Sequence, residues 1–144
     1  MRSEFRFCFS KRVRFSEIDA QGVLFNTRHN EYFDIGNAEY WRAVGRYERI
    51  SLASDIDFHV VRIVTEFVKP IRLDEEVAIC VRCQRIGTTS LTLRYELHGG
   101  GSEDLRTRGE AVHVHVARDV GKSVPIPLAF IALLERYEGT TLRG

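Results

Sequence analysis

The sequence predicts an α+β domain in which an antiparallel sheet curls around one long helix. An alternating apolar run occupies residues 5–15, and apolar residues recur at helical spacing over residues 31–44. Four further strand-like segments and a C-terminal helix follow. One helix followed by consecutive strands is typical of this class, so we assign residues 1–144 to a single domain.

The first strand is predicted at residues 5–15. Phe5, Phe7 and Phe9 alternate there with charged or polar residues, as in a strand with one buried face. Small and polar residues over 16–22 end the alternation. We therefore expect a loop between this strand and the long helix.

The long helix is predicted at residues 31–44. Its aromatic and small residues share one stripe, so we expect it to be deeply packed, and Gly45 is a natural stop. Gly36 lies inside this helix, where glycine costs about 1 kcal/mol relative to alanine. We explain Gly36 by the close approach of another backbone.

Turn residues separate the remaining elements. The four predicted strands are residues 58–68, 75–86, 90–98 and 108–117. Pro70 and the turns 87–89 and 99–102 lie between them. Pro127 precedes an amphipathic helix predicted at 128–139.

The composition is that of a soluble globular protein. Hydrophobic residues make up 44% of the 144 residues and charged residues 28%, which argues against disorder. The net charge is +1 and the Lys and Arg residues are scattered, so we expect no nucleic-acid binding. Apolar stretches are short and charges interrupt the N-terminal aromatics, so we expect neither membrane insertion nor a signal peptide.

The three cysteines predict reduced thiols instead of a disulfide framework. Their odd number suits a reducing compartment, so we expect a cytoplasmic protein. Cys80 and Cys83 form a Cys-x-x-Cys motif, but odd spacing along a strand sends their side chains to opposite faces. We interpret them as structural thiols, not as a zinc or redox pair.

Two histidines have the spacing of some metal sites. His113 and His115 point to the same face of an expected strand, while Val112, Val114 and Val116 occupy the other face. A metal would need further ligands from elsewhere. We therefore favour a strand with one apolar and one polar face, and no metal site.

Asp19 is the strongest catalytic candidate. It lies between a strand and a helix, among small and apolar residues, and Gly22 permits close approach of the backbone. The first N–H groups of a helix lack intrahelical partners and carry the positive end of the dipole, so they can polarise a carbonyl. The structural alternative is that Asp19 only caps a turn.

The region around Asp19 also resembles a known family. Residues 13–45 read VRFSEIDAQGVLFNTRHNEYFDIGNAEYWRAVG, which is similar to the opening motif of hot-dog-fold acyl-CoA thioesterases of the 4-hydroxybenzoyl-CoA thioesterase and Tol-Pal-associated type. The residues matching the family's aspartate and its Gly-Val-Val-Tyr-like run are Asp19, Gly22, Val23, Leu24 and Phe25. The later segments FVKPIRLDEEV and ARDVGKSVPIP resemble the family in the same order.

The resemblance implies a hot-dog fold and an acyl-CoA thioesterase that releases a free acid and CoA. Asp19 would be the general base or nucleophile, and the backbone N–H of Asn26 would polarise the thioester carbonyl. The family uses no metal in this scheme, and no separate cofactor is implied because CoA is part of the substrate. Relatives pair two protomers into one sheet, with active sites at the interface, so a homodimer or homotetramer is implied.

The resemblance and the apolar pattern also suggest residues that contact the substrate. The expected substrate-binding residues are Gly22, Val23, Phe25, Phe33 and Val61. The expected cations for the CoA phosphates are Arg62, Arg85 and Lys122. The loop that carries such cations in some relatives reads Gly-Thr-Thr here, at residues 87–89.

The chain departs from the family pattern near the helix start. Relatives commonly have Tyr and His where this chain has Phe25 and Asn26, and Asn-Tyr where it has Arg28 and His29. A backbone role for Asn26 survives these changes. Glu17 replaces a frequent aspartate and is the second candidate base, although we interpret it as a solvated surface residue. We interpret His29 as a local hydrogen-bond partner.

Two alternatives to an acyl-CoA thioesterase stay open. An acyl-carrier-protein thioesterase would use the same chemistry and recognise a protein surface. A dimeric module that binds acyl or aromatic ligands would have no catalytic use for Asp19. A hot-dog dehydratase is not indicated, because Leu24 stands where its Asp-x-x-x-x-His motif has the histidine.

Overall fold

The structure is a computed structural model that describes residues 1–45, 56–101, 103–117 and 121–143. The strands in these residues are β1 (Phe7–Arg12), β2 (Asp57–Phe67), β3 (Glu76–Ile86), β4 (Ser90–Gly99) and β5 (Leu105–Val116). The α-helices are α1 (Arg28–Val44) and α2 (Leu128–Glu138), and short 3-10 turns cover Arg2–Glu4 and Phe15–Glu17.

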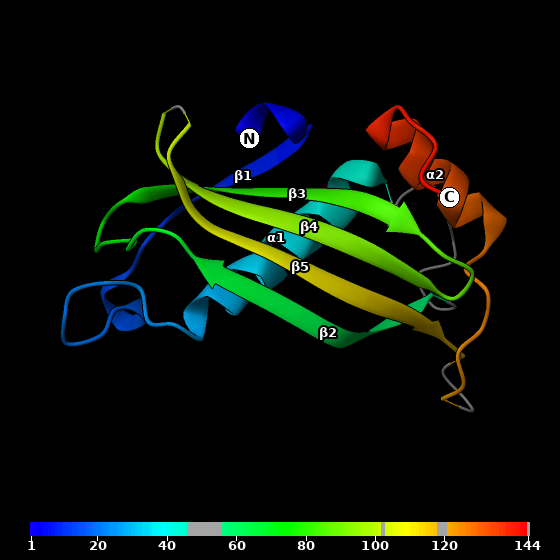
Figure 1. Cartoon of the computed structure of the whole chain (residues 1–144), viewed down its shortest axis with the longest axis horizontal. Helices are drawn as coiled ribbons and strands as arrows, with labels where there is room; N and C mark the ends of the chain where they lie inside the picture. Colours follow the sequence, from blue (N-terminus) through cyan, green and yellow to red (C-terminus); the bar gives the residue numbers. More distant parts are fainter. Residues whose placement is uncertain (46–55, 102, 118–120, 144) are drawn as a thin grey trace.

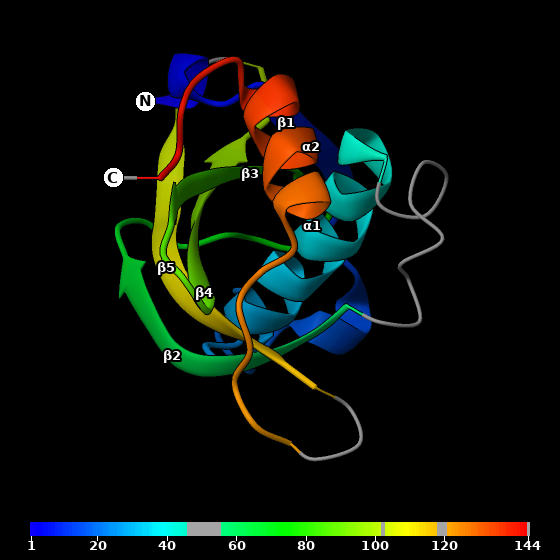
Figure 2. The same cartoon turned by 90° about the vertical axis from the view of Figure 1, so that its right-hand side faces the viewer.

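The strands form one antiparallel sheet in the order β1-β3-β4-β5-β2. Figure 1 shows α1 running obliquely across one face of this sheet. In Figure 2 the sheet curls around α1, and α2 lies beside it. The predicted α+β class, with a curled sheet on one long helix and a C-terminal helix, is confirmed.

The predicted elements are present with shifted ends. Helix α1 begins at Arg28, before the first residue of the apolar stripe, and Gly45 ends it with a left-handed φ of 89°. Strand β1 is shorter than predicted because Phe15–Glu17 coil into a 3-10 turn. Phe5 lies outside β1 and is buried against Ala78 and Cys80, apart from the main core.

The main core lies between α1 and the helix-facing side of the sheet. Phe33 of α1 stacks on Tyr95 of β4, with ring centroids 4.5 Å apart. A Cβ on Gly36 would lie 2.6 Å from Ile79 Cγ2 and 2.8 Å from Val81 Cγ2. The explanation of Gly36 by an approaching backbone is therefore corrected, because two side chains of β3 fill the space instead.

The histidine face of β5 is the reverse of the prediction. His113 and His115 are buried on the helix-facing side, whereas Val112 and Val114 on the outer side are half-buried and Val116 at the strand end is buried. His113 Nε2 lies 3.5 Å from the Tyr95 hydroxyl, and His115 Nδ1 lies 3.2 Å from the Val124 carbonyl oxygen. The Phe58 ring packs beside both imidazoles, and His115 Nε2 is buried without a hydrogen-bond partner among the described residues. Alternation along the strand could not show which face turns inward.

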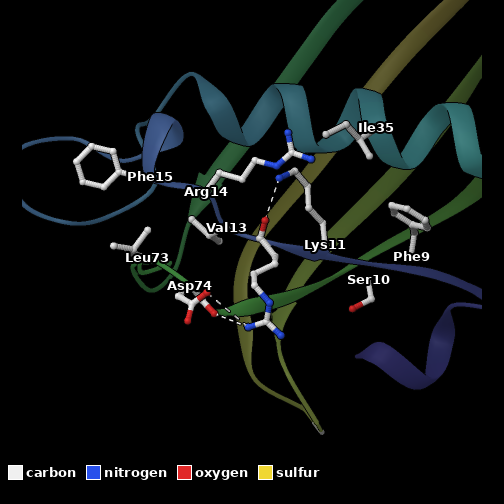
Figure 3. Close-up of a pocket in the computed structure, with 10 residues that line it drawn as sticks. Phe9, Ser10, Lys11, Val13, Arg14, Phe15, Ile35, Leu73 and Asp74 are labelled. Atoms are coloured by element: carbon white, nitrogen blue, oxygen red, sulfur yellow. Dashed lines mark hydrogen bonds and ion pairs between the residues drawn. The ribbon is translucent and has the colours of Figure 1, made fainter.

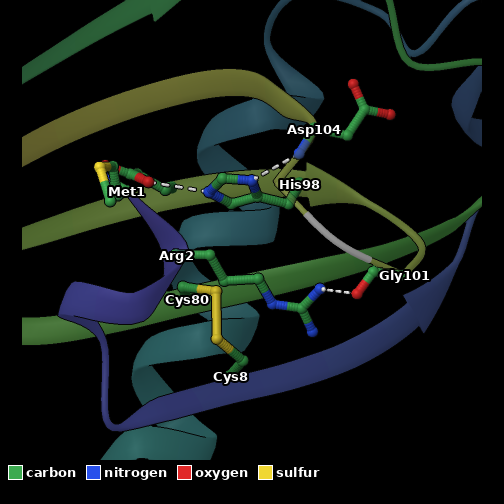
Figure 4. The surroundings of a disulfide bond; sticks show 8 residues. Met1, Arg2, Cys8, Cys80, His98, Gly101 and Asp104 are labelled. Carbon is green, nitrogen blue, oxygen red and sulfur yellow. Dashed lines mark hydrogen bonds and ion pairs between the residues drawn. A yellow bond between two sulfur atoms is a disulfide. The ribbon is translucent and has the colours of Figure 1, made fainter.

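Cys8 and Cys80 form a disulfide, which corrects the prediction of three reduced thiols. The two residues lie directly opposite each other in the pairing of β1 with β3, with Cα atoms 4.0 Å apart (Figure 4). Spacing along one strand excluded a bond between Cys80 and Cys83 but did not address a partner on the neighbouring strand. Cys83 is free and buried in the main core, on the opposite face from Cys80 as predicted.

Replacing Gly36 by alanine should destabilise the protein. Helix propensity alone would stabilise it by about 1 kcal/mol, but the new Cβ overlaps Ile79 and Val81, and overpacking of a core costs about 1–3 kcal/mol. Urea unfolding of Gly36→Ala measures the difference. Gly87→Ala is the matched control, because its Cβ meets only the Ser90 hydroxyl at 3.3 Å and the Ser90 carbonyl at 3.5 Å. A more stable Gly36→Ala protein would contradict the packing described.

Candidate active site

Asp19 lies in a small hairpin between β1 and α1. The Asp19 N–H donates to the Val23 carbonyl at 2.9 Å, Ile18 bridges to Leu24, and the Phe25 N–H donates to the Glu17 carbonyl at 3.0 Å. Asp19 Oδ1 accepts the Gln21 N–H at 2.8 Å. The carboxylate therefore caps the turn of its own hairpin and is half-buried, with its position set by backbone donors.

The hairpin is fastened to the segment that follows β2. The Leu24 N–H donates to the Ile71 carbonyl at 2.7 Å, and Val23 bridges to Arg72. Gly22 has a φ of 76°, which a residue with a side chain rarely adopts, and its carbonyl faces the Leu73 N–H at 3.4 Å. These contacts hold the Asp19 turn at one end of the sheet (Figure 1).

Asn26 lies between this hairpin and the first turn of α1. Its side chain is exposed, and its backbone N–H donates to no residue that the structure describes. The next turn is closed by the Arg28 N–H, which donates to the Phe25 carbonyl at 2.8 Å. The free N–H therefore stands at the positive end of the 17-residue helix, where it can polarise a carbonyl.

Glu17 is a buried residue, which corrects its interpretation as a solvated surface glutamate. Its side chain is in contact with Lys11, whose Nζ lies 3.0 Å from Oε1. Burial raises the pKa of Glu17, but hydrogen bonds from the Arg14 N–H, the Tyr32 hydroxyl and Lys11 outweigh it and hold the pKa below its ordinary value. Glu17 is therefore a carboxylate at neutral pH.

His29 joins the first turn of α1 to the sheet. Its Nδ1 lies 2.9 Å from Thr107 Oγ1, and its ring meets the Phe67 ring edge-to-face at 4.8 Å. Burial lowers the pKa of His29, while a backbone hydrogen bond at Leu24 acts in the opposite direction. His29 is therefore a hydrogen-bond partner between elements that are distant in the sequence.

An apolar strip on β2 lies beside the start of α1. We define this β2 strip as Val60, Ile63 and Phe67, which pair with helix-facing residues of β5 and are exposed. Thr65 on the same strand donates to the Asn30 side chain at 2.7 Å, so the strip approaches the helix start. Ile63 and Phe67 are not among the site residues predicted from the sequence, although the apolar residues on both faces of 58–68 could have indicated them.

The other residues expected in the site do not all gather around the Asp19 hairpin. Phe25 is exposed beside Asn26, whereas Phe33 is buried in the core. Val61 is exposed at a bulge in the pairing of β2 with β5, and Arg62 faces Glu110 at 3.5 Å.

The expected phosphate cations include two residues near the other end of the sheet. Arg85 lies next to the last residue of β3, and Lys122 follows β5. Those strand ends point away from the Asp19 hairpin within one protomer (Figure 1). One protomer by itself therefore does not bring these two cations to Asp19.

A cleft of about 900 Å³ lies along β1, and it is separate from the Asp19 turn. Figure 3 shows its walls, which come from residues 9–15 together with Ile35 of α1, Leu73 and Asp74. Neither Asp19 nor Asn26 lines it. The helix start and the β2 strip therefore define the candidate site better than this cleft does.

Solved structures share this fold over most of the chain. A thioesterase from Thermus thermophilus, complexed with coenzyme A and zinc, aligns with a TM-score of 0.81 at 24% identity, covering 94% of this chain and 96% of that one. A 1,4-dihydroxy-2-naphthoyl-CoA thioesterase from Synechocystis aligns with a TM-score of 0.78 at 16% identity, covering 89% and 94%. The predicted hot-dog fold is confirmed.

Sequence comparison then defines the family. The chain belongs to the thioesterase superfamily, whose family model matches residues 21–105. The predicted class of enzyme, a thioester hydrolase, is confirmed at this level. A putative esterase from Aquifex aeolicus is 26% identical over 132 residues, covering 90% of this chain and 98% of the relative.

Protein stability should fall in mild acid because His29 is buried. The unfolded chain binds a proton near the ordinary imidazole pKa of 6.5, and the folded protein resists it, so the free energy of unfolding decreases as pH falls below about 6.5. His29→Asn should flatten this decrease by at most about 1.4 kcal/mol at pH 5.5, which lies one unit below the ordinary imidazole pKa. Urea unfolding at pH 7.5 and 5.5 tests this.

The matched control for this prediction is His59→Asn, which changes an exposed histidine on β2. This variant should keep the wild-type dependence on pH. An equal slope for His29→Asn and wild type would contradict the assignment.

Proposed function

We propose that the protein hydrolyses an acyl-CoA thioester to a free acid and CoA. The observation that carries this proposal is one hairpin that holds the Asp19 carboxylate and ends at the free Asn26 N–H, beside an exposed apolar strip. The carboxylate and the donor suit the thioester group, and the strip suits its acyl chain.

The proposed reaction requires no group beyond these and water. The carbonyl oxygen of the thioester accepts the Asn26 N–H, which stabilises the charge that develops there. Asp19 either takes the proton of an attacking water or attacks the carbon itself and is then released by water. In both routes the carbon–sulfur bond breaks, the electron pair leaves on sulfur, and the proton ends on the CoA thiol. We propose that neither a metal nor a separate cofactor takes part.

Coenzyme A as the carrier is supported by the Thermus relative, which is described as complexed with coenzyme A. Acyl-carrier-protein thioesters are the alternative carrier, because they present the same reacting group. For the CoA phosphates we keep Arg62, Arg85 and Lys122 as proposed contacts, the last two from a neighbouring protomer.

We also propose that the enzyme works as a homodimer or homotetramer. Strand β2 is an edge of the sheet, and the strand and the residue after it carry six exposed apolar side chains. These belong to Val60, Val61, Ile63, Val64, Phe67 and Val68. A second copy that pairs along β2 would cover this edge, extend the sheet and complete the walls around the acyl group.

The cytoplasm is the proposed compartment. Within the described residues no helix is long and apolar enough to cross a membrane. Nucleic acid is not a proposed partner, because the net charge is only +1.

Asp19→Asn should fold normally and lose most acyl-CoA hydrolysis. The amide keeps the size of the side chain and removes its charge and basicity, so turnover should fall by about 10²- to 10⁴-fold. A panel of acyl-CoAs with a thiol-detecting assay measures this. Asp34→Asn, which changes an exposed carboxylate on α1, should stay as active as wild type.

Two results would separate the alternatives to this function. Activity of Asp19→Asn within a few-fold of wild type would refute the role of Asp19. Turnover of acyl-carrier-protein thioesters but of no acyl-CoA would identify the other carrier, and tight ligand binding without any turnover would identify a binding module.

Ile63→Lys should dissociate the assembly and abolish hydrolysis together. The charge would lie in the β2 strip, where we propose that a second copy packs. Sedimentation velocity over a concentration series, run beside the assay, reports both properties. Leu128→Lys places the same charge at a residue of α2 that is 71% exposed and should change neither. A fully active monomer would refute the shared site.

A further inference from the structure

Three elements converge on one carboxylate oxygen beneath the Asp19 hairpin. Glu17 Oε1 accepts the Arg14 N–H at 2.8 Å, the Lys11 ammonium at 3.0 Å and the Tyr32 hydroxyl at 2.8 Å. Lys11 belongs to β1, Arg14 precedes the 3-10 turn, and Tyr32 belongs to α1. Glu17 therefore joins the strand before the hairpin to the helix after it.

The side chains that contact the Glu17 carboxylate are largely shielded from solvent. Tyr32 is fully buried, and the side chains of Lys11 and Glu17 are only 11% and 10% exposed. Lys11 also lies over the Tyr32 ring, with Nζ 4.8 Å from the centroid. Figure 3 shows Lys11 and Arg14 extending from β1 and the following residues toward α1. Removing one charge of such a pair leaves the other buried and uncompensated.

The same residue closes the hairpin through its backbone. The Glu17 carbonyl accepts the Phe25 N–H at 3.0 Å, and the residue after Phe25 is Asn26. Asp19 lies two residues after Glu17 on the same arm of the hairpin, opposite the arm that leads to Asn26. Anchoring Glu17 therefore sets where the carboxylate and the free N–H stand relative to each other.

We infer that Glu17 is a positioning residue for thioester hydrolysis, and that its ion pair with Lys11 keeps Asp19 and the Asn26 N–H in register. The inference rests on the proposed function. It assigns Glu17 a positioning role in place of a second candidate base, because three donors fix the orientation of its carboxylate through Oε1. Chemistry that depends on orientation is sensitive to displacements of about 1 Å, which can change rates by about 10²-fold.

Glu17→Gln tests this inference. Glutamine keeps the size and can still accept from Tyr32 and Arg14, but it removes the charge that Lys11 requires. We expect kcat on the best acyl-CoA to fall by about 10- to 100-fold, with KM changed less than about threefold, because the acyl and CoA contacts lie elsewhere. Lys11→Met should have a similar effect. The double variant should recover part of the lost kcat, because no unpaired buried charge remains.

A second measurement follows the hairpin without any substrate. Hydrogen exchange of the Phe25, Val23 and Asp19 amides should become faster in Glu17→Gln, while the amides of β3 and β4 stay protected. Tyr32→Phe removes only one hydrogen bond and should give a smaller change in the same direction, which guards against a Glu17 variant that fails to fold. Glu39→Gln breaks the exposed pair with Arg42 on the same helix and should change neither rate nor exchange.

The two measurements separate this inference from the proposed function. Faster hairpin exchange with unchanged kcat would overturn the positioning role, and lower kcat with unchanged exchange would show that Glu17 acts chemically. If wild type hydrolyses no thioester, the proposed function fails, and if Asp19→Asn remains active, the proposed role of Asp19 fails. Exchange at the hairpin amides then decides alone whether Glu17 anchors the hairpin, and unchanged exchange would overturn that as well.

Discussion

Close packing of α1 against the sheet is the constraint on which the rest of this structure depends. A Cβ on Gly109 of β5 would overlap the Phe33 ring, and one on Gly36 would overlap Ile79. One glycine on the strand and one on the helix thus let the helix pack closer to the sheet than residues with side chains would allow. The aromatic side chains buried at this depth supply much of the apolar burial that favours folding.

The depth of α1 also fixes where its first turn stands. His29 and Asn30 join that turn to β5 and β2, and Leu24 joins the preceding hairpin to Ile71. Asp19 and Asn26 themselves make few contacts outside their own turn. Their placement is therefore set by neighbours, as the proposed roles of the carboxylate and the N–H require.

Charge is buried near the site only where several donors compensate it. Glu17 has three donors on one oxygen, and it is a carboxylate despite its burial. The exposed pair of Arg62 and Glu110 on the outer face is of a kind that contributes about 0–1 kcal/mol. The buried network beneath the hairpin is therefore of a different kind, because its charges cannot turn to water when a partner is lost.

The sequence by itself determined the fold class and the order of the elements, and it singled out the region of the candidate site. Period-two and helical spacing are local properties, and the loop from Ser16 to Gly22 is marked by its own residue types. For the same reason it predicted that Cys80 and Cys83 face opposite sides of their strand, which they do.

Only the tertiary structure decided which elements meet. It brought Cys8 opposite Cys80, turned His113 and His115 toward the helix, and buried Glu17 against Lys11. The disulfide and the burial of Glu17 each depend on a residue that is distant in the chain. The orientation of the histidines depends on which face of β5 turns inward, and alternation along the strand allows either face. Periodicity shows which residues share a face of a strand or helix, and packing against other elements determines what that face contacts.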